Sequence, residues 1–70
     1  MEREQINMEI WQLTTWFDTY YAQHEQKYNR LIALDRLTDN GENPHDKLIE
    51  LYETAETNRK RIQELESLIN

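Results

Sequence analysis

Apolar residues recur along the first half of the chain at steps that alternate strictly between four and three residues. This spacing is typical of the a and d positions of a coiled coil. It predicts one long helix over about residues 2–38, a stretch that contains neither glycine nor proline. The series contains two polar members, His24 and Lys27, and reads Ile6, Ile10, Leu13, Phe17, Tyr20, His24, Lys27, Leu31 and Leu34.

One local signal competes with a continuous first helix. Thr15 followed by Asp18 resembles the cap and third residue of a new helix. The heptad spacing nevertheless runs through this point without a stutter, which favours a helix that continues across Thr14 and Thr15.

A clear break occurs at residues 39–43, and a second helix is predicted over about residues 44–69. Gly41 can adopt the left-handed conformation that ends a helix. Asn43 and Pro44 are a favoured N-cap and first helical residue. The second apolar series, with one polar member, reads Leu48, Leu51, Ala55, Asn58, Ile62, Leu65 and Ile69. Because the two helices are separated by about five residues, we expect a single all-α domain over residues 1–70, a two-helix antiparallel coiled-coil hairpin.

Folding the hairpin at residues 39–43 predicts which side chains face one another. His24 then lies opposite Asn58, so the polar members of the two series meet, and we expect this pair to form a register-setting polar layer. Tyr21 falls near Arg59, which predicts a cation–π contact.

Some apolar residues have no predicted partner within the hairpin. The first helix is expected to extend two or three turns beyond the end of the second, and aromatic and isoleucine residues gather along one side. Wide apolar faces of this kind are typical of bundles and interfaces. We therefore expect two hairpins to dimerise into a four-helix bundle, and the N-terminal overhang is also the predicted contact for another protein. The expected association interface comprises Ile6, Ile10, Trp11, Tyr21, Tyr28, Ile32, Ile49 and Tyr52.

Composition strengthens the expectation of self-association. A chain of 70 residues buries little surface by itself, and without cysteine it has no disulfide to compensate. The net charge of −6 disfavours nucleic acid or an anionic membrane as a partner. Since no long apolar run is present, we expect a cytoplasmic protein without a membrane-spanning segment.

Residues that could carry chemistry are few. His45 lies beside Glu42 and Asp46 in the turn, where a capped helix start is the preferred interpretation over a metal site. We expect no catalytic residues, no cofactor, no metal and no small-molecule substrate. The expected function is a non-enzymatic protein–protein interaction or assembly module.

The alternative function rests on the basic cluster Arg59, Lys60 and Arg61. In length and expected topology the chain is similar in outline to the plasmid RNA-regulating four-helix bundle dimers of the Rop type, although no motif matches. That resemblance would imply binding of RNA or DNA through the basic cluster. Acidic residues surround these positions, which favours a solvated face with ion pairs within the hairpin.

Overall fold

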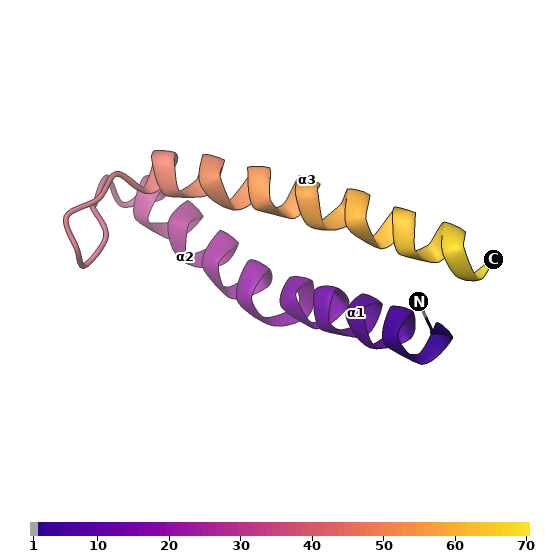
Figure 1. Ribbon diagram of the computed structural model, residues 1–70. Helices are drawn as coiled ribbons and strands as arrows, with labels where there is room; N and C mark the ends of the chain where they lie inside the picture. Colours follow the sequence, from indigo (N-terminus) through magenta and orange to yellow (C-terminus); the bar gives the residue numbers. More distant parts are fainter. Residues whose placement is uncertain (1) are drawn as a thin grey trace.

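In the computed structural model, which describes residues 2–70, two helical arms lie antiparallel and are joined at one end (Figure 1). The first arm consists of helix α1 (Arg3–Trp16), the π-helical segment η1 (Phe17–Tyr21) and helix α2 (Ala22–Ala33). The second arm is helix α3 (Pro44–Ile69). No strand occurs within the described residues. The predicted all-α fold with two helical arms is confirmed.

The start of α3 follows the predicted capping chemistry. Asn43 has an extended backbone, with φ −72° and ψ 121°, and its side chain accepts a hydrogen bond from the backbone N–H of His45 at 2.9 Å. Pro44 occupies the first turn, where its fixed φ fits a helix and its missing N–H costs nothing.

The end of the first arm differs from the prediction. Helix α2 ends at Ala33, five residues before the predicted residue 38. Asp35 adopts a left-handed φ of 54°, the backbone N–H of Arg36 donates to the carbonyl of Leu31, and that of Asp35 donates to the carbonyl of Ile32. This pair of bonds is a Schellman motif, with an aspartate where glycine is usual. Gly41, which was predicted to end the helix, lies instead in the connecting loop, where its φ is 77°.

The π-helical segment changes which residues of the first arm face α3. The arm is helical through Thr14 and Thr15, as predicted, but the wider turn that follows places one extra residue in the heptad. Beyond it Tyr21 and Tyr28 are partly buried, whereas Tyr20 is 48% exposed and Lys27 is exposed. The first apolar series is therefore correct up to Phe17. Beyond it Tyr21 and Tyr28 take the places of Tyr20 and Lys27, while His24 and Leu31 of the series remain partly buried.

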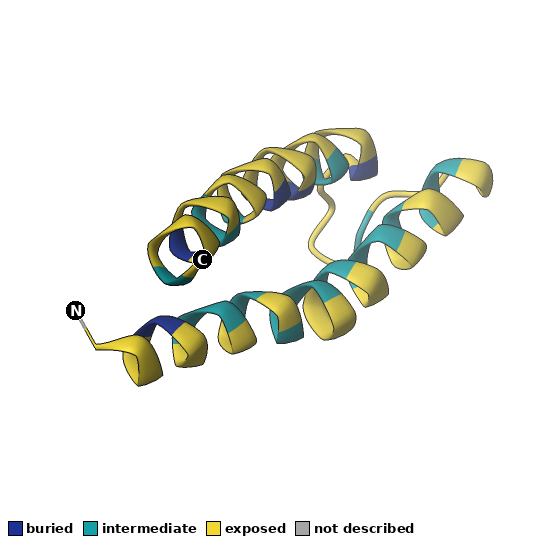
Figure 2. Ribbon diagram, turned by 90° about the vertical axis from the view of Figure 1, so that its right-hand side faces the viewer, coloured by how far each residue is buried: buried dark blue, intermediate teal, exposed yellow. Residues whose placement is uncertain are grey.

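The core lies in a single line between the two arms, where the buried positions of both face each other (Figure 2). Among residues 2–70 the buried hydrophobic side chains are Ile6, Leu51, Ala55 and Leu65. All seven positions of the second apolar series are buried or partly buried, as that series predicts.

The predicted N-terminal overhang is wrong. Ile6 is only 4% exposed and lines a small hollow with Leu68 and Ile69, and the guanidinium of Arg3 donates to the carbonyl of Ile69 at 3.4 Å. The cause is the early end of the first arm at Ala33, which moves its N-terminal end level with the end of α3. The first turn of α1 and the last turn of α3 consequently lie side by side (Figure 1).

No helix within the described part of the chain is long and apolar enough to cross a membrane.

Candidate interaction surface

Four rings of the first arm form a continuous stack, which we name the aromatic ladder: Trp16, Tyr20, His24 and Tyr28. The rings of Trp16 and Tyr20 stack with centroids 5.9 Å apart, and those of Tyr20 and His24 stack at 3.8 Å. Tyr28 meets the His24 ring edge-on at 5.8 Å. Residues four apart lie on one side of a helix, so the ladder runs along the arm as a single aromatic strip.

The ladder is built on the π-helical segment. Its wide turn brings the ring centroid of Trp16 within 5.7 Å of that of Tyr21, five residues later. Side chains supply hydrogen bonds on both sides of this turn. The hydroxyl of Thr19 donates to the carbonyl of Thr15 at 2.7 Å, and Nδ1 of His24 lies 2.8 Å from the carbonyl oxygen of Tyr20. Because a carbonyl can only accept, Nδ1 of His24 carries the hydrogen. The bond to the carbonyl of Tyr20 holds the ring of His24 within its stack.

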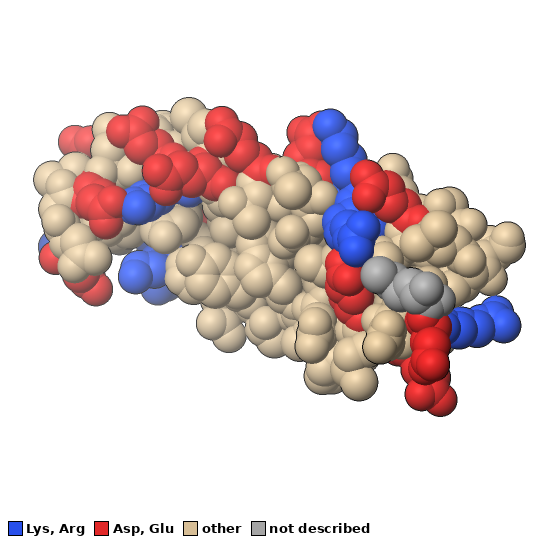
Figure 3. Space-filling model, viewed as in Figure 1, with Lys and Arg blue, Asp and Glu red and all other residues tan. Residues whose placement is uncertain are grey.

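A groove of about 270 Å³ runs between the ladder and α3, and we name it the aromatic groove. One wall is aromatic and the other is mostly polar. Figure 3 shows a broad area without charged groups over the middle of the hairpin, with charged groups on either side of it. The groove is lined by Trp16, Tyr20, Tyr28, Lys47, Glu50, Leu51 and Thr54.

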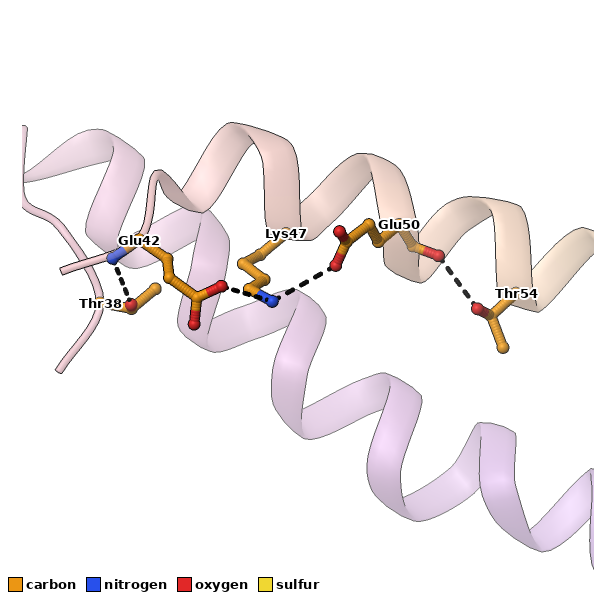
Figure 4. A network of polar contacts seen from close by, with 5 residues as sticks. All are labelled: Thr38, Glu42, Lys47, Glu50 and Thr54. Carbon is orange, nitrogen blue, oxygen red and sulfur yellow. Dashed lines mark hydrogen bonds and ion pairs between the residues drawn. The ribbon is translucent and has the colours of Figure 1, made fainter. Parts of the chain in front are cut away.

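A polar network holds the loop end of the groove (Figure 4). The ammonium of Lys47 lies 2.6 Å from a carboxylate oxygen of Glu42 and 3.4 Å from one of Glu50. These hydrogen bonds, that to Glu42 first, raise the pKa of Lys47 above its usual value. The backbone N–H of Glu42 donates to the hydroxyl of Thr38, and the hydroxyl of Thr54 donates to the carbonyl of Glu50. The network therefore ties the loop to the first turns of α3.

An ion pair joins the two arms nearer to the chain ends. Nε of Arg61 lies 2.6 Å from one carboxylate oxygen of Glu9, and Nη2 lies 3.2 Å from the other, a bidentate pairing of α3 with α1. Nη1 of Arg61 lies 3.5 Å from Glu64. The hydrogen bonds from Arg61 lower the pKa of the Glu9 carboxyl, against a smaller opposing effect of burial.

The opposite side of the hairpin carries charge as well as aromatic rings. The guanidinium of Arg59 lies 5.9 Å from the ring centroid of Tyr21, which confirms the predicted cation–π contact, and 5.1 Å from that of Phe17. The hydroxyl of Tyr21 donates to Glu25 at 2.8 Å, and its ring lies 6.4 Å from that of Tyr52. Burial, followed by the bond to Glu25, raises the pKa of the Tyr21 phenol.

The structure distributes the residues expected at the association interface over several surfaces. Tyr28 lines the aromatic groove, whereas Tyr21 and Tyr52 meet on the opposite side. Trp11 is 63% exposed beside Met8, and Ile49 is 55% exposed. Ile10 and Ile32 are partly buried. Ile6 is buried between the arms, so it offers no surface to another chain.

The expected pairing of His24 with Asn58 is not formed by a hydrogen bond within residues 2–70. His24 is bonded to the carbonyl of Tyr20 in its own arm. Asn58 is partly buried in α3, and its neighbour Arg59 lies over Phe17, more than one turn before His24. The shorter first arm accounts for this displacement of facing positions.

Potential ligands for metals or phosphates are either dispersed or already engaged. No group of three or more histidine and carboxylate side chains in the described residues is placed to hold a metal ion. In the basic cluster, Lys60 lies 3.6 Å from Glu56, Arg61 is paired with Glu9, and Arg59 lies over aromatic rings. These contacts match the ion pairs within the hairpin that the surrounding acids indicate.

Sequence reasoning did not identify the aromatic groove. The first apolar series places Tyr20 in the core, and Trp16 belongs to neither apolar series. A signal was present nevertheless, because Trp16, Tyr20, His24 and Tyr28 recur at every fourth position. Residues four apart are neighbours on a helix surface, so this recurrence marks a line of adjacent rings.

Comparison with protein-family models, curated proteins and solved structures found no match.

Proposed function

We propose that this chain is a non-enzymatic protein–protein interaction module that self-associates, two hairpins packing into a four-helix bundle. The observation that carries the proposal is the imbalance between core and surface. Within residues 2–70 five apolar residues are buried, Pro44 at the start of α3 among them, while Trp11, Tyr20, Ile49 and Tyr52 are 43–63% exposed. A chain of this size without disulfides needs more burial than one line of contacts supplies.

The total surface supports the same proposal. A compact monomer of 8.6 kDa is expected to expose about 4,700 Å². The hairpin exposes 5470 Å². The excess is roughly 800 Å², which is one partner's share of a standard-size protein interface. Packing two coiled-coil hairpins together would remove this excess.

Sedimentation equilibrium at micromolar concentration tests the proposal. We expect a mass of twice the 8.6 kDa of the chain. A species that remains at the monomer mass up to about 100 µM would refute self-association, because an interface of about 1,600 Å² in total normally holds well below that concentration.

The nucleic-acid alternative is tested on the same samples. Retention on an RNA column that weakens with salt, and that disappears when Arg59, Lys60 and Arg61 are replaced by alanine, would favour the alternative. We expect no retention, since each of these side chains is already engaged within the chain.

A further inference from the structure

We propose that the aromatic groove is occupied by a second copy of this chain, packed ladder against ladder about a two-fold axis close to Tyr20 and Thr54. This inference rests on the proposed self-association and specifies its surface and its symmetry. It differs from the interface expected from the sequence, which placed Tyr21 and Tyr52 at the contact.

The two broad sides of the hairpin differ in how readily their centres can lose water. The centre of the groove side presents Trp16, Tyr20 and the hydroxyl of Thr54. The opposite side presents Arg59 over Tyr21, with Glu25 hydrogen-bonded to the same ring. Interface centres are depleted in charged residues and enriched in tyrosine and tryptophan. The groove side therefore matches an interface centre, whereas burying the opposite side would desolvate charges.

The groove side also has the right size. The hairpin measures 47 × 17 × 16 Å between its outermost Cα atoms. One broad side is thus on the order of 800 Å², comparable to the share of each partner in a standard-size interface. A single second copy on this side would cover the roughly 800 Å² of excess surface.

The ladder determines the direction of packing. If the two-fold axis ran along the helices, the ladder of one copy would face α3 of the other and press its rings on Lys47 and Glu50. If the axis runs across the helices, each first arm faces the other first arm, and the rings stack on rings. Aromatic pairs stabilise beyond their buried area, and buried charges cost free energy. The copies are therefore antiparallel, with their loops at opposite ends.

Ion pairs lie toward both ends of this surface. Lys47 with Glu42 and Glu50 lies toward the loop, and Arg61 with Glu9 and Glu64 lies toward the chain ends. With the axis at Thr54, antiparallel packing brings Lys47 of one copy opposite Arg61 of the second copy, and each of these cations is already paired with carboxylates of its own chain. A polar rim around an aromatic centre is the usual anatomy of an interface.

Sedimentation equilibrium of matched variants tests which surface is used. Tyr20→Ala removes a ring from the groove, and Tyr52→Ala removes a ring of similar exposure from the opposite side. We expect Tyr20→Ala to raise the dimer Kd at least about tenfold, and Tyr52→Ala to change it by less than about threefold. Thr54→Lys provides a second variant at an exposed helix position, because it brings two like charges together near the axis. We expect the same weakening, with far-UV circular dichroism reporting retained helicity.

The direction of packing is measured separately. The chain has no cysteine, so Asn40→Cys at the tip of the loop accepts a single nitroxide label away from the groove. We expect pulsed electron paramagnetic resonance to give a distance between the two labels comparable to the 47 Å length of the hairpin. A short distance between labels would overturn the antiparallel arrangement.

The outcomes separate this inference from the proposed function. A dimer that Tyr52→Ala weakens while Tyr20→Ala and Thr54→Lys leave it intact overturns the groove assignment and leaves self-association standing. A wild-type chain that is monomeric overturns both.

Discussion

At the residue scale, Asp35 shows how a helix can end without the residue that usually marks its end. Its φ of 54° lies in the left-handed region, which costs a residue with a Cβ atom roughly 1–2 kcal/mol. Aspartate tolerates this region better than most residues, so the Schellman motif forms. No glycine or proline marks this position, so the sequence predicts a later helix end, at about residue 38.

Replacing this residue by glycine is expected to stabilise the hairpin. Asp35→Gly removes the left-handed penalty but adds freedom to the unfolded chain, for a net gain of about 0.5–1 kcal/mol in the free energy of unfolding. Urea unfolding followed by circular dichroism at fixed protein concentration measures the gain. Asp39→Gly in the same loop is the control, since Asp39 has no positive φ, and it should bring no gain. Equal effects of both substitutions would contradict the role assigned to Asp35.

The bidentate pair of Arg61 with Glu9 makes part of the stability depend on pH. Because the hydrogen bonds from Arg61 lower the pKa of Glu9 in the folded chain, the pair contributes stability above the ordinary value of 4.5. This contribution is lost as the pH falls through the lower pKa of the folded state.

Glu9→Gln should therefore be less stable than the wild type at pH 7 and should approach it near pH 3. Free energies of unfolding measured in urea between pH 7 and 3 would show the difference between Glu9→Gln and the wild type closing below about pH 4.5. Glu53→Gln changes an exposed carboxylate of α3 that forms no ion pair within the described residues, and its difference from the wild type should stay constant. A constant difference for Glu9→Gln as well would refute the contribution of the pair.

At the scale of elements, the π-helical segment decides how the first arm packs. A regular helix would continue the heptad and turn Tyr20 and Lys27 toward α3, whereas the wide turn partly buries Tyr21 and Tyr28 in their place. A π-helical turn is equivalent to one residue inserted in a regular helix. Removing one residue from the segment should therefore restore a regular helix without moving the buried face.

Deletion of Thr19 is expected to change the free energy of unfolding by less than about 1 kcal/mol, because Tyr21 and Tyr28 then fall on regular heptad positions. Deletion of Gln26 is the matched control. It rotates the rest of α2 by about 100° away from α3 and should cost more than about 2 kcal/mol. Thermal unfolding followed by circular dichroism compares the two. If both deletions are equally harmful, the segment is not an insertion in the heptad.

The two arms differ in how much of their structure the sequence predicts. For α3, the cap at Asn43 and Pro44 and the apolar spacing predict both its start and its buried face, because local chemistry and packing agree. For the first arm, spacing predicts the helix but not the π-helical turn, which depends on the packing of Trp16, Tyr20 and Tyr21. The polar members of the first series were an indication of this turn, since Lys27 stands one residue before Tyr28.

Which residues of the two arms face each other depends on where each arm ends. The end of α2 at Ala33, which the sequence does not predict, therefore changes the facing pairs. The layer of His24 with Asn58 and the N-terminal overhang both followed from an arm that ends too late. The cation–π contact of Arg59 with Tyr21 was still found, because a long arginine side chain spans the displacement. The aromatic groove requires the π-helical turn and the correct register together, which spacing alone does not supply.

At the scale of the whole molecule, stability should depend on protein concentration. The hairpin has one line of core contacts, and the proposed second copy supplies the remaining burial. Folding is then coupled to association, and mass action favours the folded dimer by about 1.4 kcal/mol for each tenfold increase in concentration. With an unfolding entropy of about 2.1 cal/mol/K per residue over both chains, this raises Tm by about 4–5 °C per tenfold.

Calorimetry between about 5 and 500 µM measures this dependence, and the expected total rise is about 9 °C. A tandem chain of two copies joined by about 30 Gly and Ser residues is the matched control, since such a linker can span the 47 Å between antiparallel ends. Its Tm should be independent of concentration and at least as high as the highest value for the single chain, because association is then intramolecular. If the single chain also melts at one temperature at every concentration, then its narrow core suffices alone, and the exposed ring of Tyr20 needs another explanation than a second copy.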